Sequence, residues 1–251
     1  MMEPADAAPR ARSGVVVEAK GLTRRFGPHL ALDGLDLRIE RGEAFGLLGA
    51  NGAGKTTFIR LVTGFLLPSA GSVTVDGITA VADPSGVSAR IGFVAETTRL
   101  YPELRVGTFL RFAGGARGLS GPELNARIDA GVARFHLESS LARPLGHLSK
   151  GFQQRVNLAQ AFLHDPPLMI VDEPTGGLDP LQQEEVRAVL RELRGERTLI
   201  LCTHDLGEAR ELTERVAVLF RGRRVAIGPT EEVLSGDDPL ELFRGTGRSA
   251  A

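Results

Sequence analysis

The feature that most constrains this chain is an apolar run that leads into a glycine-rich loop and then into a helix-compatible run. The loop segment, residues 44–57, reads AFGLLGANGAGKTT. Gly49, Gly54, Lys55 and Thr56 match the phosphate-loop pattern GxxxxGK(S/T), in the strand–loop–helix context that this pattern requires. The alternative is a plain glycine turn between a strand and a helix. Because the chain has only three lysines, a chance match is an event of about one in a hundred.

The residue types of this loop suit a bound triphosphate. Glycines let the backbone curl so that successive N–H groups point inward, and the helix that follows adds the positive end of its dipole. The Lys55 ammonium would lie between the β- and γ-phosphates, and the Thr56 hydroxyl would be a hard oxygen ligand for Mg²⁺. We therefore predict a site for a nucleoside triphosphate and Mg²⁺ built from Gly49, Ala50, Asn51, Gly52, Ala53, Gly54, Lys55, Thr56 and Thr57.

Composition narrows the class of protein. The 251 residues are 42% hydrophobic, which is enough for one substantial core or two unequal lobes. The formal net charge of −1 provides no global attraction for nucleic acid, so no nucleic-acid partner is predicted. The single cysteine, Cys202, excludes an internal disulfide and fits a reducing compartment.

Hydrophobic patterns divide the chain into regions. Alternating runs between residues 15 and 39, with turns at Gly27-Pro28 and Asp33-Gly34, predict an antiparallel strand group before the loop. Helix-compatible runs dominate from Val106 to His147 and predict a helical subdomain inserted into an α/β core. Apolar runs at 91–94, 167–173 and 198–203 predict further strands of that core. We predict a disordered tail over 1–14, one domain over 15–235 with its helical subdomain at about 103–160, and a C-terminal extension over 236–251.

One helix has a clear start signal. Asp179, Pro180 and Gln182 are typical of an N-cap, a first helical position and a third helical position. The helix is predicted to run to Arg194, with Glu184 placed to pair with Arg187 one turn on.

The buried-type strand predicted at 167–173 ends in two carboxylates, Asp172 and Glu173. In an open α/β sheet, ligands bind at the carboxyl ends of parallel strands, so Asp172 could reach a Mg²⁺ held by Thr56. Glu173, one residue on, is expected to point another way and to polarise an attacking water or accept its proton. Taken alone, the pair could instead be an acidic cap between strand and loop.

Phe26 and His204 carry weaker signals. The aromatic face of Phe26 could stack on adenine, worth roughly 1–3 kcal/mol by analogy with base stacking on aromatic side chains, but a phenylalanine at such a position is more often a buried core residue. His204 ends the strand predicted at 198–203, and a lone histidine there is often a turn or core residue.

From about Val15 to Leu234, the chain resembles the ATP-binding cassette (ABC) ATPases, the nucleotide-binding subunits of ABC transporters. Residues 49–57 look like the Walker A loop, residues 168–172 look like Walker B, and Glu173 follows as the catalytic glutamate. Residues 148–155 (LSKGFQQR) resemble the signature motif, residues 177–180 (GLDP) the D-loop, and His204 the switch histidine. Phe26 falls where the family has an adenine-stacking aromatic.

The chain departs from the family pattern at two motifs. The signature reads LSKGF instead of LSGGQ, which retains Ser149 and Gly151 and brings in Lys150 and Phe152. The usual Q-loop glutamine is Glu96, which can still ligate Mg²⁺ but adds a negative charge near the phosphates. Both variants look similar to a bacterial exporter-type branch of the family.

The resemblance implies a fold and a mechanism. The fold is α/β, a P-loop NTPase core with a mixed sheet, an N-terminal antiparallel β-subdomain and an inserted α-helical subdomain. Each ATP would lie between the Walker A loop of one copy and Ser149 and Gly151 of a second copy, or of a homologous ATPase. Glu173 and His204 would be catalytic, and Thr56, Glu96 and Asp172 would hold the metal.

The implied role is to drive substrate movement through separately encoded transmembrane permease subunits. The protein would then be cytoplasmic and peripheral on the inner face of the cell membrane. Export is favoured because the chain has no room for the C-terminal regulatory domain of many importers. An importer ATPase and a non-transport protein that assembles through ATP-gated pairing remain the alternatives.

Overall fold

The computed structural model describes residues 14–96 and 100–235. The C-terminal extension predicted over 236–251 lies outside the described residues, as does the tail predicted over 1–14 apart from Gly14. Within the described parts of the chain, no helix is both long enough and apolar enough to span a membrane.

An antiparallel sheet of three strands contains the first two strands of the chain and a third that follows the phosphate-loop helix. Its order is β2-β1-β4, made by β1 (Val15–Phe26), β2 (His29–Glu40) and β4 (Ala70–Val75). Along β2, Leu35, Leu37 and Ile39 are buried, while the residues between them are exposed. Because burial alternates from one residue to the next, one face of the sheet packs against the core and the other faces solvent. The predicted N-terminal antiparallel group is confirmed.

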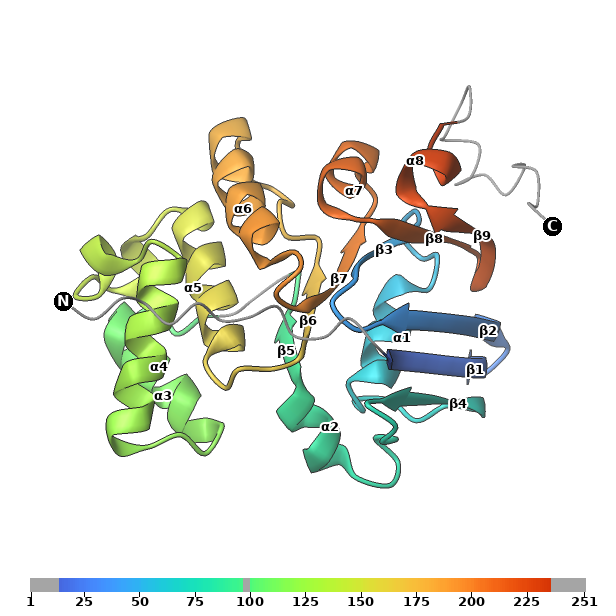
Figure 1. Cartoon of the computed structure of the whole chain (residues 1–251), viewed down its shortest axis with the longest axis horizontal. Coiled ribbons are helices and arrows are strands. Elements are labelled where there is room, and N and C mark those ends of the chain that lie inside the picture. Colours follow the sequence, from blue (N-terminus) through green and yellow to red (C-terminus); the bar gives the residue numbers. More distant parts are fainter. Residues whose placement is uncertain (1–13, 97–99, 236–251) are drawn as a thin grey trace.

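A mixed sheet of six strands occupies the centre of the molecule (Figure 1), in the order β5-β6-β7-β3-β8-β9. The first five strands in this order are parallel, and β9 runs antiparallel to β8. Three of them, β3, β6 and β7, are buried along their whole length, as expected for parallel strands covered on both faces. The strands are β3 (Ala44–Leu48), β5 (Ile91–Val94), β6 (Leu168–Asp172), β7 (Thr198–Thr203), β8 (Arg215–Phe220) and β9 (Arg223–Pro229).

The helix after the phosphate loop, α1 (Lys55–Val62), packs between the two sheets. Its Phe58, Ile59, Leu61 and Val62 share one hydrophobic cluster with the antiparallel sheet and with one face of the central sheet. The start of α1 is therefore fixed from both sides, which sets the position of the loop that precedes it.

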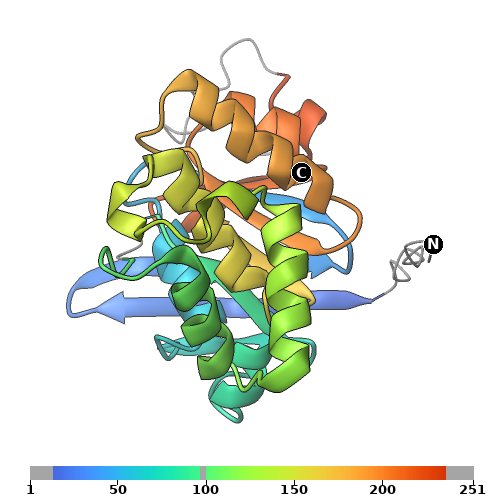
Figure 2. The same ribbon diagram turned by 90° about the vertical axis from the view of Figure 1, so that its left-hand side faces the viewer.

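The other face of the central sheet packs against helices from later in the chain. Three of them, α3 (Val106–Ala116), α4 (Gly121–Arg134) and α5 (Lys150–Phe162), gather at the end of the molecule opposite the antiparallel sheet (Figures 1 and 2). The predicted fold class, with its inserted helical subdomain, is confirmed. The remaining helical elements are α2 (Pro84–Arg90), α6 (Pro180–Leu193), α7 (Leu206–Leu212), α8 (Thr230–Val233) and short 3-10 turns at Glu138–Ser140 and Leu145–His147.

The predicted start of α6 is confirmed, but its predicted ion pair is wrong. The Gln182 amide donates to Asp179 Oδ1 at 2.9 Å, and Pro180 is the first helical residue. Glu184, however, contacts Arg191 two turns on, while Arg187 faces Gln183 and Glu211. The spacing of residues along α6 could not predict that α7 places the carboxylate of Glu211 beside Arg187.

Two local predictions, a turn and a helical run, are also wrong. The chain does not reverse direction at Asp33-Gly34, because strand β2 continues through these residues. Between Leu32 and Leu35, β2 advances three residues while β1 advances two, so Gly34 (φ +61°) belongs to a β-bulge. Within the helix-compatible region from Val106 to His147, residues 137–142 form no α-helix and contain only the 3-10 turn Glu138–Ser140. No sequence pattern predicted α2, whose N-cap is Asp83.

Candidate functional site

The phosphate loop links β3 to α1 and leaves no room for side chains at two of its glycines. A Cβ on Gly49 would lie 2.6 Å from the carbonyl oxygen of Leu219, and one on Gly54 would lie 2.8 Å from that of Ala31. Gly54, with φ +115°, is also the N-cap of α1. Glycine is therefore required here by close backbone contacts as well as by conformation.

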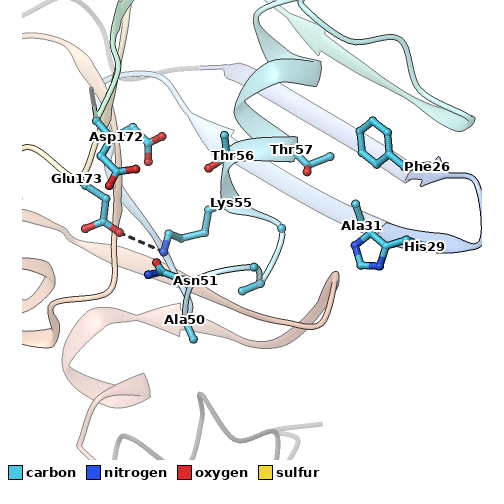
Figure 3. A pocket seen from close by; sticks show the side chains of 14 residues that line it. Phe26, His29, Ala31, Ala50, Asn51, Lys55, Thr56, Thr57, Asp172 and Glu173 are labelled. Carbon is cyan, nitrogen blue, oxygen red and sulfur yellow. Dashed lines mark ion pairs between the residues drawn. The ribbon is translucent and has the colours of Figure 1, made fainter. Parts of the chain in front are cut away.

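The loop forms one wall of a pocket of about 210 Å³ (Figure 3). Carboxylates lie at one end of this pocket, and Phe26 and His29 lie at the other, with Lys55 and Thr56 between them. Most of the residues predicted to bind a nucleotide or a metal line it. The lining residues are Phe26, His29, Ala31, Ala50, Asn51, Gly52, Ala53, Gly54, Lys55, Thr56, Thr57, Glu96, Asp172 and Glu173.

Lys55 is buried at the centre of this site. Its Nζ donates to the Gly49 carbonyl oxygen at 2.5 Å and lies 3.2 Å from Glu173 Oε1. The side chains of Lys55 and Glu173 are only 7% and 9% exposed. Gly49 does not line the pocket itself, but its carbonyl holds the lysine that does. A buried cation is thus held above the loop, where it can bind an anionic group.

Asp172 is a buried carboxylate at the carboxyl end of β6. Burial, together with the negative charges of Glu173 and Glu96, raises its pKa to about 6, although Lys55 acts in the opposite direction. A hard divalent cation would offset this accumulation of negative charge. Thr56 and Glu96 line the same pocket as Asp172, and their hydroxyl and carboxylate oxygens are the ligands that Mg²⁺ prefers. The donor set therefore fits Mg²⁺.

Glu173 does not follow the side-chain alternation of a strand. Its backbone is left-handed, with φ +46°, so Asp172 and Glu173 line the same pocket. The prediction that the two carboxylates point in different directions is wrong for this reason. Glu173 Oε2 lies 2.9 Å from Nδ1 of His204, which follows β7 and is 61% exposed. His204 is thus outside the pocket lining but in direct contact with the carboxylate.

Phe26 is not a core residue, since it is 41% exposed at the far end of the pocket. The Arg24 guanidinium lies 4.5 Å from its ring centroid, and Arg24 Nη1 donates to the Leu67 carbonyl oxygen at 2.8 Å. One face of the ring is therefore supported by a cation. His29 and Ala31 were not predicted from the sequence; they join the lining because β2 pairs with β1 beside Phe26.

Ser149 and Gly151 are not brought to this pocket. Ser149 is the N-cap of α5, and its Oγ accepts from the Phe152 amide at 3.3 Å. The Gly151 amide donates to Gln182 Oε1 at 3.2 Å. Lys150, between them, lines a separate hollow of about 520 Å³ together with Glu96, Glu173, His204 and part of the 176–178 loop. The predicted binding residues therefore form two groups within one chain.

Comparisons with known proteins agree with this geometry. The family model for the ABC transporter matches residues 32–176. The chain is 36% identical over 220 residues to a probable multidrug ABC transporter ATP-binding protein of Escherichia coli, covering 87% of this chain but only 38% of that protein. It is 37% identical over 229 residues to a daunorubicin resistance ATP-binding protein of Streptomyces coeruleorubidus, covering 90% of this chain and 72% of that one.

Solved structures give the same result. An ATP-binding subunit of an ABC transporter superposes with a TM-score of 0.80 at 32% identity, covering 92% of this chain and 99% of that one. A bacterial ABC transporter cassette described as dimeric gives a TM-score of 0.75 at 28% identity, covering 85% and 98%. The phosphate loop, the paired carboxylates and these matches together lead to one conclusion: the chain belongs to the ABC transporter family and is an ATP-binding cassette of that family.

Proposed function

We propose that this chain binds Mg·ATP, hydrolyses it and so drives export through separate membrane subunits. The observation that carries the proposal is the convergence of Lys55, Asp172 and Glu173, from the loop and from the end of β6, on one pocket lined by glycines. A buried lysine, a metal-ligating carboxylate and a second carboxylate beside an anion-binding loop are the parts that phosphoryl transfer to water requires.

Each group then has a chemical role. The amides of residues 50–52 and 54–56 and the Lys55 ammonium bind the β- and γ-phosphates, while the Ala53 amide donates to the Ala50 carbonyl oxygen within the loop. Thr56 and Asp172 hold Mg²⁺, with Glu96 within the same lining. Bound Mg²⁺ supplies charge neutralisation on the phosphates. Glu173 orients the attacking water and accepts its proton, and His204 holds the Glu173 carboxylate in place. Phe26 stacks on the adenine.

A second cassette would complete the nucleotide site. Ser149 and Gly151 lie away from the pocket of their own chain, at the start of α5, where a helix N-terminus is suited to bind a phosphate from another molecule. The Gly151 amide is engaged by Gln182, so α6 must release it before it can donate to a γ-phosphate. The dimeric cassette among the solved relatives supports such pairing, either with a second copy or with a homologous ATPase.

The direction of transport, export, is proposed from the names of two relatives. One is named for multidrug transport and one for daunorubicin resistance. The membrane partners would be permease subunits encoded separately, which would hold this chain at the cytoplasmic face of the membrane. The genes that neighbour this one supply the first test of the partnership, since an open reading frame for a polytopic membrane protein is expected among them.

Hydrolysis is tested directly on the purified chain. We expect release of inorganic phosphate from Mg·ATP, and we expect EDTA to abolish that release because Thr56 and Asp172 then hold no cation. Reconstitution with the neighbouring membrane protein in vesicles should stimulate the rate. Absence of ATP binding by the folded chain would overturn the proposal.

A further inference from the structure

The hairpin between β8 and β9 ends in a tight turn directly against the phosphate loop. Phe220 pairs with Arg223, and the two residues between them are both left-handed, with φ +46° at Arg221 and φ +80° at Gly222. Positive φ at both central positions defines a type I′ turn, which matches the twist of the strands that it joins. We call residues 220–224 the hairpin tip.

Both backbone polar groups of Gly222 bind other parts of the chain. Its amide donates to the carbonyl oxygen of Ala53 in the phosphate loop at 2.9 Å. Its own carbonyl oxygen accepts from the amide of Asp33 in β2, also at 2.9 Å. One buried glycine therefore links the hairpin tip, the phosphate loop and the antiparallel sheet.

Two arginine side chains of the hairpin tip also bind strand β2. Arg223 Nε donates to Asp33 Oδ2 at 2.7 Å, and Arg224 Nη1 donates to the Asp36 carbonyl oxygen at 2.6 Å. These contacts hold the tip against β2, so its position relative to the phosphate loop is fixed by more than one bond.

No side chain fits at Gly222. A Cβ there would lie 2.8 Å from the Ala31 carbonyl oxygen and 3.2 Å from the Leu32 Cα. Both obstacles are backbone atoms, which cannot swing away as the end of a flexible side chain can. From the other side, a Cβ on Gly54 would lie 3.5 Å from the Gly222 Cα, so the two glycines face each other across the contact.

The bond to Ala53 determines where the next amide points. In a trans peptide the C=O of one residue and the N–H of the next point in opposite directions, and the chain has no cis peptide among the described residues. The Ala53 carbonyl points at the hairpin tip, so the Gly54 N–H points away from it, and Gly54 lines the nucleotide pocket. No described residue accepts a hydrogen bond from that amide.

We infer that Gly222 is a positioning residue of the nucleotide site: by holding the Ala53 carbonyl, it aims the Gly54 amide at the bound phosphates. This inference rests on the proposed function, because it assumes that the pocket binds a nucleotide. It assigns to the β8–β9 hairpin, which contributes no lining residue to the pocket, a share of the affinity for phosphate.

A matched pair of alanine variants tests the inference. Gly222→Ala introduces both backbone strain and the clash with Ala31. Gly77→Ala introduces the same kind of strain, at φ +76°, but a Cβ at Gly77 meets nothing within 4 Å. We expect Gly222→Ala to raise the Kd for Mg·ADP about tenfold, as loss of one buried hydrogen bond would, and to raise the KM for ATP more than it lowers kcat. Gly77→Ala should leave both unchanged.

Titration calorimetry on variants shown to be folded by circular dichroism gives these constants. Equal Kd values for the two variants would overturn the inference while leaving the proposed function intact. Failure of the wild-type chain to bind Mg·ADP would instead count against the proposed function.

If Gly222→Ala does not fold, amide hydrogen exchange on the wild-type chain tests the inference about Gly222. The Gly222 amide should exchange at least about tenfold more slowly than that of exposed Gly77, and saturating Mg·ADP should slow it further, because the nucleotide immobilises its acceptor. Exchange at Gly222 that does not respond to Mg·ADP would refute the inference.

Discussion

Replacement of Glu173 by glutamine separates nucleotide binding from hydrolysis. Glu173 Oε1 lies 3.2 Å from Lys55 Nζ, and both side chains are nearly buried. Coulomb's law with an effective dielectric constant of about 20 gives an attraction of about 5 kcal/mol between unit charges at this distance, an upper estimate that omits desolvation. ATP must share Lys55 with this carboxylate, and its γ-phosphate also meets the negative charge of Glu173.

The substitution removes both effects while conserving shape. If about a quarter of that attraction is released to the nucleotide, roughly 1.3 kcal/mol, the Kd for Mg·ATP should fall nearly tenfold. Hydrolysis should slow by about 10²- to 10⁴-fold, because a glutamine cannot accept the proton of the attacking water. Bound but uncleaved ATP should then hold two chains together.

Three measurements check this prediction: calorimetric titration for the Kd, phosphate release for the rate, and light scattering for the mass. Glu184→Gln is the matched control, since it removes a surface ion pair with Arg191 that should contribute under about 1 kcal/mol to stability and nothing to binding. Weaker ATP binding by Glu173→Gln, wild-type turnover, or a monomer at saturating ATP would refute the reasoning.

Three other substitutions probe the rest of the site. Lys55→Ala should weaken ATP binding about a hundredfold and abolish turnover, because it removes the phosphate contact and leaves Glu173 Oε1 without its cation; normal turnover would contradict the role proposed for Lys55. Phe26→Ala should raise the KM for ATP about tenfold, more than it lowers kcat, if stacking is worth roughly 1–3 kcal/mol; an unchanged KM would exclude stacking. Asp172→Asn should raise the nucleotide-free Tm at pH 7.5. Burial raises the pKa of Asp172 from 3.8 to about 6, so the folded protein holds this proton more tightly than the unfolded chain does. The free energy of unfolding of the wild-type chain should therefore fall by up to about 3 kcal/mol between pH 4 and pH 6, and Asp172→Asn should not show this loss. A Tm difference between the two proteins that does not change with pH would refute this prediction.

Local signals with a single physical cause were predicted well from the sequence. The Asp179 cap of α6 and the strand ending at Asp172 depend on a few neighbouring residues, and the structure has them where the patterns indicate. The phosphate loop is also local, since its glycines and Lys55 follow one another in the chain. For the same reason, most of the candidate pocket could be predicted.

Features that depend on distant partners were missed. The direction of Glu173 follows from a left-handed backbone next to Lys55, and a strand pattern contains no sign of it. The Asp33-Gly34 sequence suits a β-bulge as well as a turn, and only the pairing of β2 with β1 shows that it forms a bulge. The contact between Gly222 and Ala53 joins residues far apart in the sequence, so spacing within either segment could not predict it.

The lone cysteine has a practical consequence. Cys202 lies in β7 between Leu47 and Asp172 on the neighbouring strands, with no exposed surface, and burial raises the pKa of its thiol well above the usual range. The thiolate is the nucleophile that attacks maleimide reagents, so this buried sulfur, which stays protonated, should remain unlabelled in the native protein. A cysteine introduced on the surface would then carry a dye or spin label alone, and distances between two paired chains could be followed without first removing the native one.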